Sequence, residues 1–181
     1  AAASAQETEQ AVSLLRQALH IADESPWPPI AAVGHLSLGN AYRLKGQVYL
    51  LAQPRDLEEA SKWFNVALQE FQTALSFFKE NEQTRYVGWT QLGMATTHLL
   101  QAYVPLQQIT LHEDLATANL RKQESVRLFQ LAAAEAQQCI DLGEHVNDLA
   151  YKQKVLDCGC VYYQVRASEL AEQVQATIKE Q

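Results

Sequence analysis

The sequence has little of what interrupts helices or cross-links a chain. Its 181 residues include only seven glycines, five prolines and three cysteines. Cys139, Cys158 and Cys160 are too few, and odd in number, for a disulfide framework. We therefore expect buried, reduced thiols in a cytoplasmic protein. No apolar run approaches the roughly 18 residues that a membrane span requires, so no membrane contact is expected.

Basic residues are scarce as well. Lysine and arginine number 14 against 21 aspartates and glutamates, which gives a formal net charge of -7. Proteins that neutralise the nucleic-acid backbone usually carry a basic face, so nucleic acid is not an expected partner. Hydrophobic residues make up 48% of the chain and charged residues 19%. This composition is typical of a globular protein with a buried core and not of a disordered one.

Good helix formers fill the remaining sequence. Apolar residues recur at spacings of three and four, whereas the alternation typical of strands is nearly absent. The chain is therefore expected to be all-α, built from antiparallel helices. The expected helices cover residues 7–23, 29–44, 57–78, 81–103, 111–142 and 145–178, the last being one long helix or a tightly turned pair.

Capping residues mark several of the expected helix ends. Asp56–Glu59 and Thr110–Glu113 each place a capping residue three positions before a glutamate, which is typical of a helix start. Gly46 and Gly143 follow apolar-periodic segments and are expected to end them, because glycine readily adopts the left-handed conformation. The short acidic segment 112–114 is expected to cap a helix and not to bind metal.

A pattern recurs along the chain. Residues 32–46 place His35, then Leu38–Gly39, then Tyr42 on one helix, and Trp89 with Leu92–Gly93 repeats the first part of this arrangement. A weaker third copy contains Cys158–Gly159 and Tyr162. The expected helix 57–78 lies between the first two copies, and small and aromatic residues alternate along it. They follow the spacing of Ala60, Phe64, Ala67 and Leu68, which recurs at Ala67, Phe71, Ala74 and Leu75.

These motifs resemble the helix pairs of the tetratricopeptide repeat family. Glycine and alanine let the paired helices approach closely, and the aromatic residues fill the gaps between successive pairs. The glycines at 39, 93 and 159 are farther apart than the family's period of about 34 residues, so the repeats are degenerate and carry insertions. The resemblance implies a single domain over residues 1–181, complete or part of a longer protein, with helix pairs stacked as an α-solenoid.

The resemblance also implies a function. Tetratricopeptide proteins bind a partner protein or peptide in a groove lined by the first helix of each pair, and many regulate or recruit an effector. The chain is accordingly expected to be a protein-binding scaffold and not an enzyme, with no cofactor. By the family's pattern, the groove positions include Val33, Leu36, Asn40, Arg43, Leu44, Thr90, Met94, Thr97 and His98. The family's carboxylate clamp is not expected, because leucine occupies position 36 where the clamp has lysine.

Other site chemistries find little support in the sequence. The five histidines show no pair one helical turn apart, as a helical zinc site would need. Cys158 and Cys160 point to different faces if they lie in one helix, so no metal is expected there. No nucleophile elbow or glycine-rich phosphate loop is present. The aromatic residues around Trp63 and Phe71 are expected to form core and not a ligand pocket.

Two alternatives to partner binding stay open. Apolar residues near both ends of the chain, such as Val12 and Val165, would suit helical self-association as a homodimer. The second alternative is a small-molecule-sensing helical domain with a pocket lined by Trp89, Met94 and His98.

Overall fold

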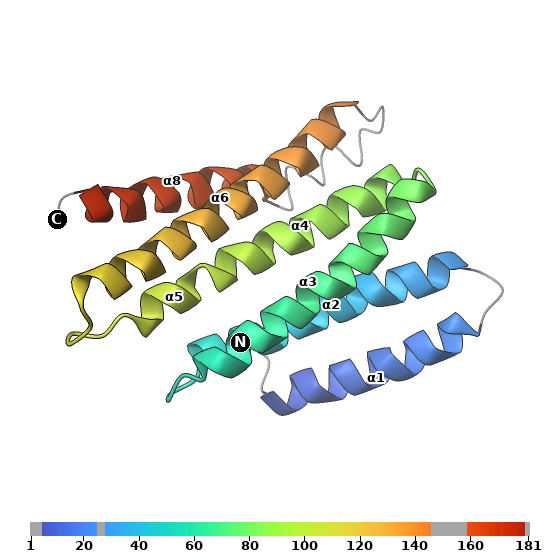
Figure 1. Cartoon of the computed structure of the whole chain (residues 1–181). Helices are drawn as coiled ribbons and strands as arrows, with labels where there is room; N and C mark the ends of the chain where they lie inside the picture. The colour runs from blue at the N-terminus through green and yellow to red at the C-terminus, as the bar shows by residue number, and fades with distance from the viewer. Residues whose placement is uncertain (1–4, 25–27, 146–158, 180–181) are drawn as a thin grey trace. The chain divides into compact units, whose positions relative to one another are not determined.

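The computed structural model describes residues 5–24, 28–145 and 159–179, and these form α-helices joined by turns, without a β-strand among them (Figure 1). The expected all-α fold class is confirmed. The helices are α1 (Ala5–Asp23), α2 (Pro28–Leu51), α3 (Leu57–Glu80), α4 (Thr84–Gln101), α5 (Tyr103–Gln108), α6 (Leu115–His145) and α8 (Cys160–Lys179). None of the described helices combines the length and apolarity needed to cross a membrane.

The chain divides into two compact units, Ala1–Gly93 and Met94–Gln181, and the division falls within α4. Unit 1 contains α1, α2, α3 and the first part of α4. Unit 2 contains the rest of α4 with α5, α6 and α8. The expectation of one domain over residues 1–181 stays a prediction, and each unit is described by itself below.

In unit 1, α2 packs against both α1 and α3. The side of α3 predicted to be apolar is buried, with Phe64, Ala67 and Phe71 all fully inaccessible to solvent. Phe71 contacts two glycine positions: a Cβ atom placed on Gly39 of α2 would lie 2.6 Å from its Cε1, and one on Gly93 of α4 would lie 2.7 Å from it. The close helix packing predicted from the two Leu-Gly pairs is therefore present in this unit.

The prediction that Gly46 ends a helix is wrong, because α2 continues to Leu51. Gly46 is buried within the helix, and a Cβ atom there would lie 2.7 Å from Cδ1 of Phe64 and 3.1 Å from the carbonyl oxygen of Ala60. The glycine allows α3 to approach, and it adopts no left-handed conformation that would stop the helix.

The helix expected over residues 81–103 is shorter than predicted. Asn81 is the C-cap of α3, and α4 begins at Thr84 and ends at Gln101. Pro105 explains this end, because its ring clashes with the carbonyl four residues earlier and it has no N–H to donate. The short α5 accommodates Pro105 in its first turn, where a missing N–H breaks no helical hydrogen bond.

The structure contains the capping contact predicted at Asp56–Glu59, whereas the capping box predicted at Thr110–Glu113 is wrong. Asp56 accepts a 3.0 Å hydrogen bond from the backbone N–H of Glu59 at the start of α3. The helix expected after Thr110 begins at Leu115 instead, because Asp114 accepts from the N–H of Thr117 at 2.9 Å. Hydrogen bonds from Thr117 hold the pKa of Asp114 below its usual value. The expectation that this acidic segment caps a helix is thus confirmed.

The end predicted for the following helix is also wrong. α6 passes through Gly143, which is buried, and continues to His145. Gly159 has φ of +80° and immediately precedes α8, so it does not lie within a helix as the third repeat copy requires. Cys158 of that copy lies outside the described residues.

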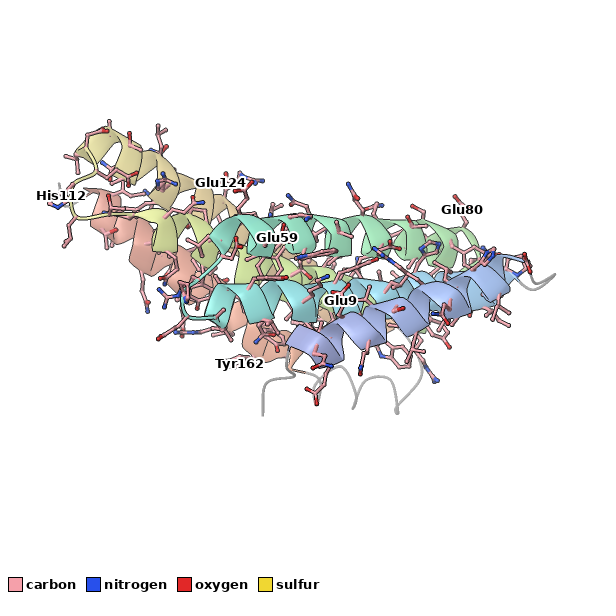
Figure 2. The ribbon with its side chains drawn as sticks, turned by 90° about the horizontal axis from the view of Figure 1, so that it is seen from below. Glu9, Glu59, Glu80, His112, Glu124 and Tyr162 are labelled. Atoms are coloured by element: carbon pink, nitrogen blue, oxygen red, sulfur yellow. The ribbon has the colours of Figure 1, made fainter. Side chains whose placement is uncertain are left out.

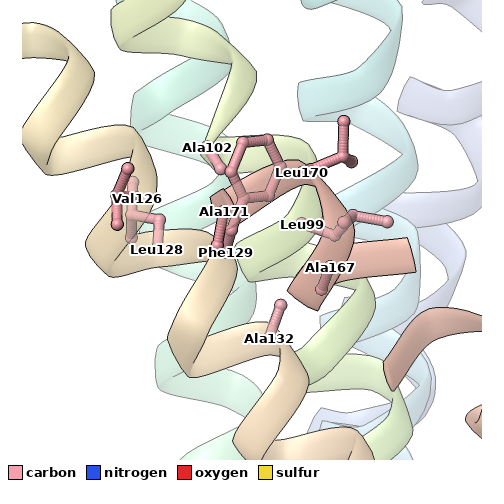
Figure 3. Close-up of a cluster of buried hydrophobic side chains, with 9 residues drawn as sticks. All are labelled: Leu99, Ala102, Val126, Leu128, Phe129, Ala132, Ala167, Leu170 and Ala171. Atoms are coloured by element: carbon pink, nitrogen blue, oxygen red, sulfur yellow. The ribbon is translucent and has the colours of Figure 1, made fainter. Parts of the chain in front are cut away.

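The core of unit 2 joins α4, α6 and α8. Phe129 is fully buried and meets the ring of Tyr103 edge-on, with 5.5 Å between ring centroids. Figure 3 shows the surrounding cluster, formed by Leu99, Ala102, Val126, Leu128, Phe129, Ala132, Ala167, Leu170 and Ala171.

Candidate functional site

Helix α2 carries all the groove positions predicted for the first repeat copy, and two of its sides are covered. On the side toward α1, Gly34 lies against Leu19. On the side toward α3, Gly39 lies against Phe71, and His35 Nδ1 lies 2.7 Å from Glu70 Oε2. These contacts leave one side of α2 open to solvent.

The open side carries apolar side chains at helical spacing. Ile30, Val33, Leu44 and Leu51 are exposed by 42%, 36%, 42% and 62% respectively. Successive spacings of 3, 11 and 7 residues place these four side chains on one side of the helix, and half-buried polar residues lie between them. We call this surface the α2 stripe, and its members are Ile30, Val33, Ser37, Asn40, Leu44 and Leu51.

The polar members of the α2 stripe are bonded within their own helix. Ser37 Oγ donates to the carbonyl of Val33 at 2.9 Å, and Asn40 Nδ2 donates to the carbonyl of Leu36 at 3.1 Å. The stripe therefore offers mainly apolar contact, and a partner would have to compete with these local bonds for the polar groups.

A polar and aromatic network on α1, α2 and α3 lies away from the stripe. Lys45 is only 7% exposed, and its ammonium lies 3.7 Å from the ring centroid of Trp63 and pairs with Glu9 of α1. The ring of Trp63 stacks on Tyr42 at 5.4 Å. Arg16 Nε of α1 donates to the Tyr42 hydroxyl at 2.6 Å. The network connects all three helices, so the position of α2, and with it the α2 stripe, is fixed relative to α1 and α3.

Trp63 also donates to Glu59, one turn earlier on α3, with 2.8 Å between Nε1 and Oε2. The other carboxylate oxygen accepts from Lys62 at 2.7 Å. The pKa of Glu59 is lowered by the bond from Lys62 first and by the bond from Trp63 after it, against an opposing effect of desolvation. Figure 2 labels Glu59 on α3 and Glu9 on α1, the two carboxylates of this network.

In the structure, some of the predicted groove residues are buried and others are partly exposed to solvent. Leu36, Thr90 and Thr97 are buried, at 7%, 0% and 0% exposure, so they offer a partner no surface as the described residues are arranged. The partly exposed members are Asn40, Arg43, Met94 and His98. Met94, Thr97 and His98 belong to unit 2, whereas the others belong to unit 1. Partner binding by these residues stays a prediction.

His98 has a partner within its own unit. Its Nδ1 lies 2.8 Å from Oε2 of Glu135 on α6, and the two side chains are only 13% and 14% exposed. The pair resembles that of His35 and Glu70 in unit 1, which also joins two helices. A role for His98 in contacting another protein would require this pair to open.

We expect Glu135→Ala to lower the free energy of unfolding by about 1–2 kcal/mol, because it leaves a mostly buried imidazole without its acceptor. Glu135→Gln keeps an oxygen for the imidazole and should cost less. Arg127→Ala, which removes an exposed ion pair with Glu124 on the same helix, should cost under about 1 kcal/mol. Urea denaturation of the three variants measures these differences. Equal losses for Glu135→Ala and Arg127→Ala would contradict a structural role for the buried pair.

Ser37 and two apolar members of the stripe were missed in the sequence. Ile30 and Leu51 continue the spacing of Val33 and Leu44, but the helix was expected to end at Leu44, which placed Leu51 in a spacer. Once α2 is extended to Leu51, the spacing alone identifies both. Glu70 and Glu135 had no local signal, because their histidine partners lie 35 and 37 residues away.

Among the described residues, no cluster of three or more histidine, cysteine, aspartate or glutamate side chains could hold a metal ion. Comparison of the chain with protein-family models, curated proteins and solved structures gave no match. The tetratricopeptide resemblance therefore stays a prediction based on the sequence motifs.

Proposed function

We propose that this protein is a protein-binding scaffold, and that the α2 stripe binds a segment of a partner protein carrying apolar side chains. The observation that carries the proposal is the row of four exposed apolar side chains, Ile30, Val33, Leu44 and Leu51, on a helix covered on its other sides. A partner that covers the row removes this apolar surface from water, which favours association.

The mechanism is passive. The packing of α2 on α1 and α3 holds the stripe in one arrangement before binding, so the scaffold loses little conformational entropy when a partner docks. Each apolar side chain that becomes fully covered contributes on the order of 1 kcal/mol, because all four are already partly buried. Specificity comes from the spacing of the apolar contacts along the helix and from the polar groups between them.

We propose further that the helix pairs are degenerate tetratricopeptide-like repeats. The glycines of both Leu-Gly pairs approach the same phenylalanine, Phe71, and Gly46 approaches Phe64. Small-to-aromatic contacts of this kind are what the repeat pattern requires within each helix pair and between successive pairs. In this interpretation α2 is a first helix, and its stripe belongs to the groove face.

The experiment uses the chain as bait for affinity capture, followed by a titration of each captured protein in purified form. Leu44→Glu places a carboxylate in the middle of the α2 stripe, and Leu14→Glu is the matched control on α1, where Leu14 is 65% exposed. We expect Leu44→Glu to weaken binding by about tenfold or more and Leu14→Glu to leave it unchanged. His98 is kept intact, because its replacement would break the pair with Glu135.

Circular dichroism confirms that both variants remain folded before they are compared. Equal affinity of Leu44→Glu and the wild type would move the binding surface away from the α2 stripe. Loss of binding in both variants would point to a general effect of added negative charge on this acidic chain.

A second candidate function, self-association, is favoured by one observation in unit 2. Val161, Tyr162 and Val165 on α8 are exposed by 41%, 64% and 46%. Tyr162 is labelled on α8 in Figure 2. Val161 and Val165 lie one turn apart and would suit the same surface on a second copy. Size-exclusion chromatography with light scattering distinguishes this homodimer from a monomeric scaffold.

A further inference from the structure

Two buried cysteines meet where α6 packs against α8. The Sγ atoms of Cys139 and Cys160 lie 2.9 Å apart, and the residues are 1% and 0% exposed. The structure places no disulfide bond between them, and both are buried as expected. The two sulfurs are closer together than thiols packed only as hydrophobic groups need to be. They are still farther apart than the roughly 2.0 Å of a disulfide bond. Neither the proposed scaffold nor its stripe uses this pair.

The local structure makes Cys160 the more reactive sulfur. It is the first residue of α8, directly after Gly159 with its positive φ. The N-terminus of a helix favours a thiolate. The pKa of Cys160 is lowered first by its hydrogen bond with Cys139 and further by the backbone N–H of Cys160, while burial opposes both effects.

We propose that Cys139 and Cys160 are a modification site at which a peroxide forms an intramolecular disulfide between α6 and α8. The sulfurs already lie side by side on helices that pack together. The disulfide therefore requires only that the two sulfurs move slightly closer, and neither helix has to leave the other. The low exposure of both sulfurs favours a small oxidant over a bulky one.

The chemistry balances with hydrogen peroxide as the oxidant. The Cys160 thiolate attacks one peroxide oxygen, an S–O bond forms, the O–O bond breaks, and the departing hydroxide takes up a proton to become water. The sulfur of Cys139 then attacks the sulfur of Cys160. An S–S bond forms, the S–O bond breaks, and the hydroxide leaves as water with the proton of the Cys139 thiol. Two thiols are oxidised by two electrons, and one peroxide is reduced to two waters.

The bond would close a loop across 21 positions of the chain and tie the start of α8 to α6. A cross-link of this kind restricts the unfolded chain and stabilises the folded one. We expect the oxidised protein to melt roughly 5 °C or more above the reduced protein.

The test treats the full chain with hydrogen peroxide, blocks remaining thiols under denaturing conditions and maps peptides without reduction. Because Cys158 and Cys160 share one tryptic peptide, between Lys154 and Arg166, the map is made on Cys158→Ser as well as on the wild type. Met94, the only methionine, serves as an internal reference for general oxidation. We expect a peptide linked through Cys139 and Cys160 to form about tenfold faster than the sulfoxide of Met94.

The single variants separate the steps. In Cys139→Ser the sulfenic acid of Cys160 has no partner thiol in α6, so a sulfenic-acid probe should label Cys160 and the melting temperature should not rise. Oxidised glutathione is the bulky comparison, and it should form the bond more slowly than peroxide. A link from Cys139 to Cys158, a link between two chains, or oxidation of Met94 before either thiol would overturn the proposal.

Discussion

A chain carrying Gly39→Leu is expected to lose about 3 kcal/mol or more in its free energy of unfolding. Even a single Cβ atom at this position would lie 2.6 Å from Cε1 of Phe71. The ring is fully buried and is also approached by the backbone at Gly93, so it has little room to move. Leucine would therefore force α2 and α3 apart. Urea denaturation followed by circular dichroism measures the loss.

Gly34→Ala is the matched control on the same helix. A Cβ atom there would lie 2.8 Å from Cδ1 of Leu19, which is the end of a flexible side chain that can rotate away. Alanine also favours the helix over glycine by about 1 kcal/mol, so this variant should be as stable as the wild type or more stable. In the double variant Gly39→Ala with Phe71→Leu, the two losses should be less than additive. Unchanged stability of Gly39→Leu would contradict the close packing.

The second large effect is expected in unit 2, where Phe129→Ala should lower the free energy of unfolding by about 3–5 kcal/mol. Phe129 is fully buried within a cluster contributed by α4, α6 and α8. Removing its ring leaves a cavity and deprives Tyr103 of its edge-on contact. The loss can be followed by urea denaturation and by the near-ultraviolet circular dichroism of the tyrosines.

Leu120→Ala is the comparison for Phe129→Ala, because Leu120 lies on the same helix and is 65% exposed. Its replacement should change the free energy of unfolding by no more than about 0.5 kcal/mol. If Phe129→Ala costs less than about 1 kcal/mol, the cluster shown in Figure 3 does not stabilise unit 2 as described.

The side of α3 that becomes buried was predictable from the sequence alone. Phe64, Phe71 and Phe78 recur every seven residues, and Asp56 marks the start of the helix. Both signals are local, because the helical period and the capping bond each involve residues within one or two turns of one another. Local signals of this kind need no knowledge of what the helix packs against.

The glycines were harder to interpret. Gly46 and Gly143 look like helix ends in the sequence, yet both lie within helices. A glycine can end a helix, or it can let another helix approach, and the residue type is the same in both cases. The choice at Gly46 depends on Phe64, which lies 18 positions away on another helix.

The candidate site shows the same limit. The family's pattern placed Val33, Asn40 and Leu44 in the groove, but the pattern does not tell which side of the helix remains open in this chain. Leu36 and Thr90 were expected in the groove and are buried. Their burial depends on neighbouring helices that the local pattern does not specify.

The sequence by itself determined the all-α class, the apolar side of α3 and the capping contact at Asp56, because each follows from the backbone geometry of one helix. Only the tertiary structure decided which glycines hold helices together and which side of α2 remains exposed. It also decided that His98 meets Glu135 and that Cys139 meets Cys160. These pairs join residues many helical turns apart, and no periodicity within one helix encodes which side chains a second helix brings beside it.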